Sequence, residues 1–204
     1  MSDNTVSYEF DEESAGKADN FVGRIDKSDA YIGQFVSVNA MKAKSGTHGI
    51  HFEFKTEGDG FAGLDIYTKK EDGSVVNMGM NLLNAIQAVL GLRGLKSRLG
   101  KFEGFVEGKR QEIEGEIFPD LMNRDIGVVL QKELYTKNDG SDGYRINLVG
   151  VFHPTSRLTA SEIKERVTKP EKLAKLMSNL KTKDSRVKQV EPSQPAVGAD
   201  AGSY

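Results

Sequence analysis

The fold is decided by the stretch YIGQFVSVNAMKAK-SGTHG-IHFEFK-TEGDG-FAGLDIYTKK, residues 31–70. In its middle run Ile50, Phe52 and Phe54 alternate with polar residues, which is the period of a half-buried β-strand. The glycine-rich turns between the runs are short enough to join antiparallel neighbours. The stretch therefore predicts a three-stranded antiparallel meander with one face in the core.

Alternation also assigns the faces of the other two runs. In the first run, Val36 and Val38 are expected to share one face with Ala40, and Phe35 to point to the other. In the third run, Leu64 and Ile66 are expected to be buried. The residues that alternate with them are expected to lie outside: Phe61, Asp65, Tyr67 and Lys69.

A helix is predicted after the meander. Asn81 is the expected N-cap, apolar residues follow at helical spacing, and Gly91 and Gly94 end the helix. The glycine-rich, basic link over residues 91–104 has two interpretations, a solvated loop or a contact for phosphates. Within residues 105–125 only a short strand at Ile113–Ile117 and a turn at Phe118–Met122 are indicated.

Alternation returns at Ile126 and continues to Phe152 around a turn-forming loop, residues 137–143, so a second hairpin of long strands is expected. A meander, a helix and a terminal hairpin match the order of elements in the five-stranded OB barrel. The predicted fold is mainly β: an OB-like barrel with a helix between its third and fourth strands and with helices appended at the C-terminal side.

The sequence divides into four segments. An acidic, mobile segment is expected over residues 1–28, the barrel over 29–155, a helical segment over 156–182 and a disordered tail over 183–204. Two capping boxes begin the expected C-terminal helices, Thr159–Glu162 and Thr168–Glu171, the second with Pro170 at the first helical position.

Composition narrows the classes of function. The chain has 204 residues, no cysteine and three histidines, which excludes disulfides and thiolate metal sites and leaves few imidazole ligands, so no cofactor is expected. There is no apolar run of about 20 residues to cross a bilayer and no leader-like N-terminus, so a cytoplasmic protein is expected. Residues 1–30 hold eight acidic and three basic residues, whereas residues 157–188 hold ten basic and four acidic residues. This asymmetry suggests a partner for each charged end or an interaction between the two ends, and the alternative is two solvated charged segments.

A family resemblance covers roughly residues 30–155. The segments AKSGTHGIHFEF (43–54), GMNLLNAIQAVLG (79–91) and PDLMNRDIGVVLQKELY (119–135) resemble single-stranded-DNA-binding proteins of tailed bacteriophages. The resemblance implies an OB fold and sequence-tolerant binding of single strands during phage replication or recombination, without catalysis and in the host cytoplasm. Such proteins often end in an acidic tail that recruits replication partners. This chain departs from that pattern, with only Glu191 and Asp200 after Lys188, and the acidic aromatic stretch Tyr8–Glu13 is the alternative recruiting segment.

Cations and aromatic residues on the outer face mark the expected binding surface, because lysine and arginine neutralise phosphates and aromatic rings stack on bases. The expected contacts with single-stranded DNA, with RNA as the alternative, are Lys42, Lys44, His48, His51, Lys55, Phe61, Tyr67, Lys69, Arg93, Lys96, Arg98, Lys132, Tyr135, Lys137 and Arg145.

Two other functions fit parts of the sequence. Glu53 and Lys55 have the E-x-K spacing of metal-dependent nucleases, with Asp59 and Asp65 as further carboxylates. A protein-interaction module, homo-oligomeric or docking replication proteins through its charged ends, is the third interpretation.

Overall fold

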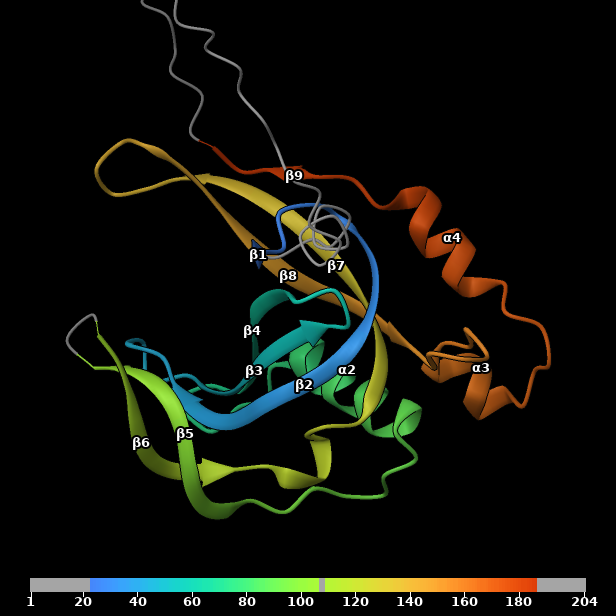
Figure 1. Cartoon of the computed structure of the whole chain (residues 1–204), viewed down its shortest axis with the longest axis horizontal. Helices are drawn as coiled ribbons and strands as arrows, with labels where there is room; N and C mark the ends of the chain where they lie inside the picture. The colour runs from blue at the N-terminus through green and yellow to red at the C-terminus, as the bar shows by residue number, and fades with distance from the viewer. Residues whose placement is uncertain (1–22, 107–108, 187–204) are drawn as a thin grey trace, which may run out of the picture.

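The computed structural model describes residues 23–106 and 109–186, which form a curled, half-barrel sheet with a few appended helices (Figure 1). The mainly β architecture is therefore confirmed. The elements in chain order are β1 (Gly23–Arg24), β2 (Asp29–Lys42), β3 (His48–Thr56), β4 (Gly60–Lys69), α2 (Asn77–Val89), β5 (Arg98–Val106), β6 (Lys109–Ile117), η1 (Pro119–Leu121), β7 (Asp125–Thr136), β8 (Asp142–Phe152), α3 (Ala160–Glu165), α4 (Lys172–Asn179) and β9 (Lys183–Asp184).

The predicted meander and the closing hairpin are both present. β2, β3 and β4 pair antiparallel in sequence order, and β7 pairs antiparallel with β8. β7 also pairs antiparallel with β2 from Asp29 to Gln34, which attaches the hairpin to the meander. The core follows the predicted alternation in β3 and β4, with Phe52 and Phe54 fully buried and Leu64 1% exposed.

The prediction for β2 was wrong because of a β-bulge at Val36. Phe35 pairs with Phe54 and Ser37 pairs with Glu53, so Val36 is an extra residue that shifts the alternation. As a result Phe35 and Val38 are both fully buried, whereas Val36 is 38% exposed.

The helix α2 begins four residues before the predicted N-cap. Val76 occupies the N-cap position without a side-chain hydrogen bond, and Asn77 is the first helical residue. Gly79 explains the early start, because a Cβ atom there would overlap the carbonyl oxygen of Tyr67 on β4. The bare backbone lets the first turn pack directly on the sheet, and this burial outweighs the missing cap. The predicted end is confirmed, since Gly91 follows the helix with a φ of +68°.

The expected loop over residues 91–104 and the unassigned link after it contain an additional hairpin, β5–β6. Its glycines make room for neighbouring side chains: a Cβ atom at Gly100 would collide with Ile117, and one at Gly104 would lie 2.5 Å from Cδ1 of Ile113. The short strand predicted at Ile113–Ile117 is therefore the second half of a longer strand. The described fold also extends past two predicted boundaries, since β1 pairs with β4 and β9 pairs with β7.

One capping box forms and the other does not. The Thr159–Glu162 box caps α3 as predicted, but α4 begins at Lys172 with no side-chain cap from its own N-terminal residue. The Glu162 carboxylate caps both helices instead. One of its oxygens accepts hydrogen bonds from the N–H and the hydroxyl of Thr159, both at 2.8 Å, and the other accepts from the N–H groups of Glu171 at 2.7 Å and Lys172 at 2.8 Å. Glu162 is 2% exposed, so these donors replace its hydration.

No helix in residues 23–106 and 109–186 is long and apolar enough to cross a membrane. The charged stretch Tyr8–Glu13 lies outside the described residues, as does the part of the predicted tail after residue 186.

Replacing Glu162 by glutamine is expected to lower the free energy of unfolding by about 1–3 kcal/mol at neutral pH, because an amide nitrogen cannot accept the backbone N–H bonds. The N–H of Lys172, followed by those of Thr159 and Glu171, holds the pKa of Glu162 at about 2, against an ordinary 4.5. A lowered pKa stabilises the fold above the ordinary value, and the gain is lost as the pH falls from about 4.5 towards 2. Urea denaturation at a series of pH values should show the two proteins converging in acid.

Glu165→Gln is the control, because this carboxylate lies on the same helix and its ion pair with Lys172 is exposed. It should change the stability by less than about 1 kcal/mol. Equal losses in the two variants would contradict the double cap.

Candidate nucleic-acid interface

The outer face of β3 and β4 carries several of the predicted site residues. The antiparallel register places Lys55 opposite Phe61 and His51 opposite Asp65. Because the alternate residues of β4 are buried, the ring of Phe61 is left 51% exposed and that of Tyr67 37% exposed. Large apolar rings on a solvent-facing sheet surface are available for stacking.

His51 lies flat on this face. Its Nδ1 is 2.6 Å from a carboxylate oxygen of Asp65, and a Cβ atom at Gly63 would come within 3.2 Å of the imidazole ring. A carboxylate only accepts hydrogen bonds, so Nδ1 carries the proton and donates it. This hydrogen bond therefore holds the imidazole ring in one orientation on the outer face of β3 and β4.

The carboxylates of the nuclease interpretation have other partners. Lys55 pairs with Asp59 at 2.6 Å across the β3–β4 turn, and Asp65 is bonded to His51. Within the part of the chain that the structure describes, no group of three or more His, Cys, Asp or Glu side chains is arranged to hold a metal ion.

A buried carboxylate organises the face of the β7–β8 hairpin. The Glu133 side chain, only 3% exposed, accepts hydrogen bonds from Nε of Arg145 at 3.0 Å and from Nδ2 of Asn147 at 2.7 Å. The C-terminal strand adds the hydroxyl of Ser185 at 2.7 Å and the ammonium of Lys183 at 3.0 Å. These donors, Arg145 foremost, hold the pKa of Glu133 well below its usual range, against the opposing effect of burial.

Arg145 is thereby fixed between aromatic residues from two other strands. The hydrogen bond to Glu133 is the main cause that raises the pKa of Arg145, and the nearby phenols of Tyr135 and Tyr67 raise it further. Its guanidinium carbon lies 5.9 Å from the centre of the Tyr135 ring. The structure therefore brings together Tyr67 of β4, Tyr135 of β7 and Arg145 of β8, all three predicted from sequence.

Further predicted cations lie at the ends of these strands. The register pairs Lys42 with His48 and His48 with Lys69, so these three lie side by side at one end of β2, β3 and β4. A bulge at Thr68 separates Lys69 from Tyr67, so these cations lie on the opposite face of the sheet from Tyr67, contrary to the prediction for Lys69. Lys44 lies in the turn that joins β2 to β3. Lys137 follows β7 and lies next to Tyr135. A Cβ atom at Gly143 would lie about 3.0 Å from both the Lys137 side chain and the Tyr135 ring.

Lys132 belongs to a separate cluster on the opposite face of β7. Its ammonium lies 4.8 Å from the centre of the Tyr144 ring, and the guanidinium of Arg24 lies 4.7 Å from the same ring. Arg24 pairs with Phe61 through β1 and β4, so this cluster adjoins the other end of the β4 face. Arg24 and Tyr144 were not among the predicted contacts. Arg24 lies in the acidic segment, and Tyr144 has the same alternation as the core residues of its strand.

The predicted cations after α2 lie elsewhere. Arg93 and Lys96 are exposed in the connection from α2 to β5, and Arg98 begins β5. In the sheet, β5 is separated from β4 by β6, β2 and β3. The structure does not bring these three residues into the Tyr67–Tyr135–Arg145 cluster.

Replacing Glu133 by alanine is expected to lower the free energy of unfolding by about 1–3 kcal/mol, because the donors of Arg145, Asn147 and Ser185 lose a buried acceptor. Hydrogen exchange should accelerate at the N–H of Ser185, which donates to Leu134 and fixes the end of β9. Glu112→Ala, which removes an exposed ion pair with Lys101, is the control and should cost less than about 1 kcal/mol. Unchanged exchange at Ser185 would contradict the role of Glu133 in holding β9.

No protein-family model matches the chain, and no curated protein matches it in sequence. The site is therefore described by its own residues: an aromatic and cationic face on β4, β7 and β8, organised by one buried carboxylate.

Proposed function

We propose that this protein binds single-stranded DNA, with little sequence preference, on the outer face of β4, β7 and β8. The observation that carries the proposal is the convergence of Tyr67, Tyr135 and Arg145 from three strands. Each tyrosine ring supplies a stacking surface worth about 1–3 kcal/mol per base, whatever the base. Arg145, held by Glu133, supplies a fixed positive charge for a phosphate.

The order of the elements supports an OB-type barrel as the scaffold. The meander β2–β3–β4 is followed by α2, and the closing hairpin β7–β8 returns to pair β7 with β2. β8 lies close to β4, the strand it would meet if the barrel closed. In this proposal the hairpin β5–β6 is an insertion between the helix and the fourth barrel strand. OB barrels bind oligonucleotides on the face of their second and third strands, which are β3 and β4 here, and on the adjoining loops.

The cations on this face define a path for the phosphates. Lys137 lies beside the ring of Tyr135, and Lys55 lies opposite Phe61 on the outer face of β3 and β4. A face that stacks bases on its rings and binds phosphates with its cations suits the single-stranded DNA that is exposed during replication or recombination of phage-type DNA. The proposed role is to protect and organise these strands without cutting them.

Replacing Tyr67 or Tyr135 by alanine is expected to weaken the binding of oligo-dT by about 5–100-fold, the loss of one stacked base. Fluorescence titration at several salt concentrations measures this, and the wild-type affinity should fall steeply as salt rises. Arg145→Gln should weaken binding and flatten the salt dependence.

Lys164→Gln is the matched control for charge, because Lys164 is an exposed cation on α3 outside the proposed path. Its affinity should stay within about twofold of wild type. Unchanged affinity in both tyrosine variants would discard this binding face.

Incubation of labelled single-stranded DNA with the protein and Mg²⁺ is expected to leave the DNA intact. Lys55, which would orient a water in the nuclease interpretation, is paired with Asp59, and Asp65 is bonded to His51. Gel electrophoresis of the DNA measures this. Cleavage that disappears in Glu53→Gln would support the nuclease interpretation over the binding proposal.

A further inference from the structure

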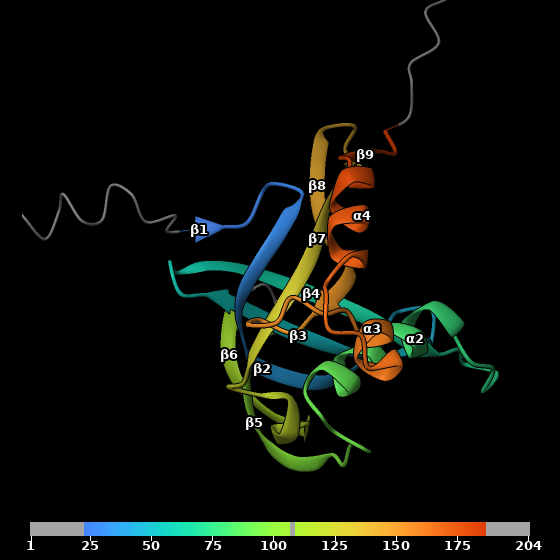
Figure 2. The ribbon, with the colours of Figure 1, turned by 90° about the vertical axis from the view of Figure 1, so that its right-hand side faces the viewer.

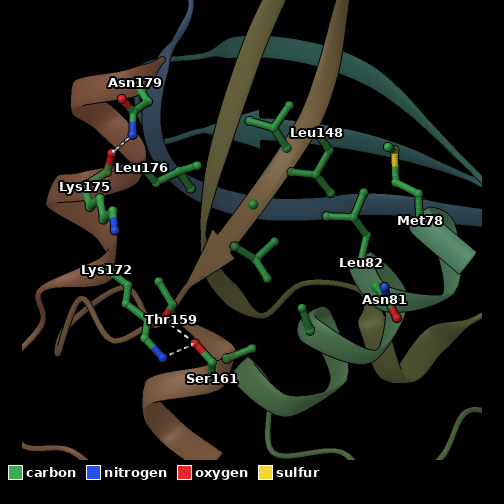
Figure 3. Close-up of a pocket in the computed structure, with 15 residues that line it drawn as sticks. Met78, Asn81, Leu82, Leu148, Thr159, Ser161, Lys172, Lys175, Leu176 and Asn179 are labelled. Atoms are coloured by element: carbon green, nitrogen blue, oxygen red, sulfur yellow. Dashed lines mark hydrogen bonds between the residues drawn. The ribbon is translucent and has the colours of Figure 1, made fainter.

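A second concave surface lies apart from the candidate interface. A groove of about 930 Å³ is bounded by α2 and α4, with β8 as its floor and the start of α3 at one end (Figure 3). This volume is in the range of pockets that hold ligands. Figure 2 shows α4 standing over β8, and the groove runs beneath it. None of the described residues lining it belongs to the predicted nucleic-acid contacts.

The α2 wall of the groove is apolar and uncharged. α2 buries one stripe of residues against the sheet, including Leu83 and Ile86, and presents a second stripe, Met78, Leu82 and Ala85, to the groove. Met78 is 78% exposed, and none of the 13 residues of α2 carries a charge. Surface helices ordinarily carry charged residues on the face away from the core. The exposed Met78 next to the partly buried Leu82 and Ala85, on a helix without charges, therefore indicates a surface that another molecule covers.

The α4 wall is cationic. Lys172, Lys175 and Asn179 face the groove around Leu176 (Figure 3), and α4 buries none of its own residues. Leu176 rests on Gly150 of β8, where a Cβ atom would lie 2.7 Å from its Cδ2. This contact seats α4 on the sheet and sets the width of the groove. The described residues 157–186 hold nine basic and four acidic residues, so the positive charge extends beyond these two lysines.

We propose that this groove binds an acidic amphipathic helix of a partner protein. Both walls present residues at i, i+3 or i+4, and i+7, the spacing that a helix lying along them would match. The apolar face of the incoming helix packs against Met78 and Leu82. Its acidic flank faces Lys172 and Lys175, where Glu165 already supplies one carboxylate at 3.0 Å from Lys172.

The described part of this chain does not offer such a helix to a second copy. α2 has no acidic residue, α4 carries lysines and no acidic residue, and α3 is six residues long. The charge of the groove and the composition of these helices together favour a different protein as the occupant.

The test uses the full chain and two synthetic, fluorescein-labelled helical peptides. Both carry leucine at i, i+4 and i+7, and the adjoining flank is glutamate in one and lysine in the other. The chain is expected to bind the glutamate peptide at least about tenfold more tightly than the lysine peptide. Met78→Glu and Lys175→Glu should each weaken this binding by about tenfold or more, measured by fluorescence anisotropy.

Asn84→Glu on α2 and Lys164→Glu on α3 are charge-matched controls, because both residues are exposed and neither lines the groove. They should leave the affinity for the glutamate peptide within about twofold. Oligo-dT binding should persist in Met78→Glu, so a failure at the groove is distinguishable from a failure of the proposed nucleic-acid interface.

Four results would overturn the proposal. The first is equal binding of the two peptides, and the second is a loss of binding in the controls as large as in the groove variants. The other two would assign the groove to a different occupant. A peptide of residues 1–22 displaces the glutamate probe, which would assign the groove to this chain's own acidic segment. Self-association that is lost in Met78→Glu, measured by sedimentation, would assign it to a second copy.

Discussion

The strand β2 is hydrogen-bonded along both of its edges, and the arrangement of the other strands depends on this sharing. β3 occupies one edge from Gly33 to Lys42, whereas β7 occupies the other from Asp29 to Gln34 and β6 pairs further along at Asn39. The bulge at Val36 falls where β7 leaves the strand, and bulges bend a strand and increase its twist. This bend curls the sheet, and it turns Phe35 onto the core ring of Phe52, with 4.8 Å between ring centres.

Alternation predicted the core wherever the strands are regular. It succeeded from Ile50 to Phe54 in β3 and from Ala62 to Ile66 in β4, where each residue pairs with one partner. It failed in β2, where the bulge at Val36 shifts the alternation, and in β8, where the bulge at Val149 places Val151 in the core with Leu148. A bulge adds one residue to a strand, and nothing in the local sequence pattern marks it. The glycines of β5 and β6 led to the prediction of a loop for a related reason. In sequence, a glycine that makes room for a neighbouring side chain looks the same as a glycine that makes a turn.

The candidate site was predictable in its residue types and only partly in its grouping. Tyr67, Tyr135 and Arg145 were predicted because they are aromatic or cationic and alternate with the expected core residues of their strands. The burial of Glu133 was not predictable, since its partners include Lys183 and Ser185, about 50 positions away and within the expected tail. Arg24 joins Tyr144 only through the pairing of β1 with β4, a contact that no local pattern encodes.

The short strand β9 lies on the same edge of β7 that β2 occupies earlier in the strand. β2 pairs with β7 up to Leu130, the hydroxyl of Ser28 accepts from the N–H of Lys132, and β9 pairs from Glu133. The backbone groups of β7 along this edge are therefore satisfied in sequence by three different segments. An uncovered strand edge is a template on which other chains can add strands and aggregate. The lysine and serine that bind Glu133 thus have a second effect, which is to anchor β9 as a cover over this edge of β7.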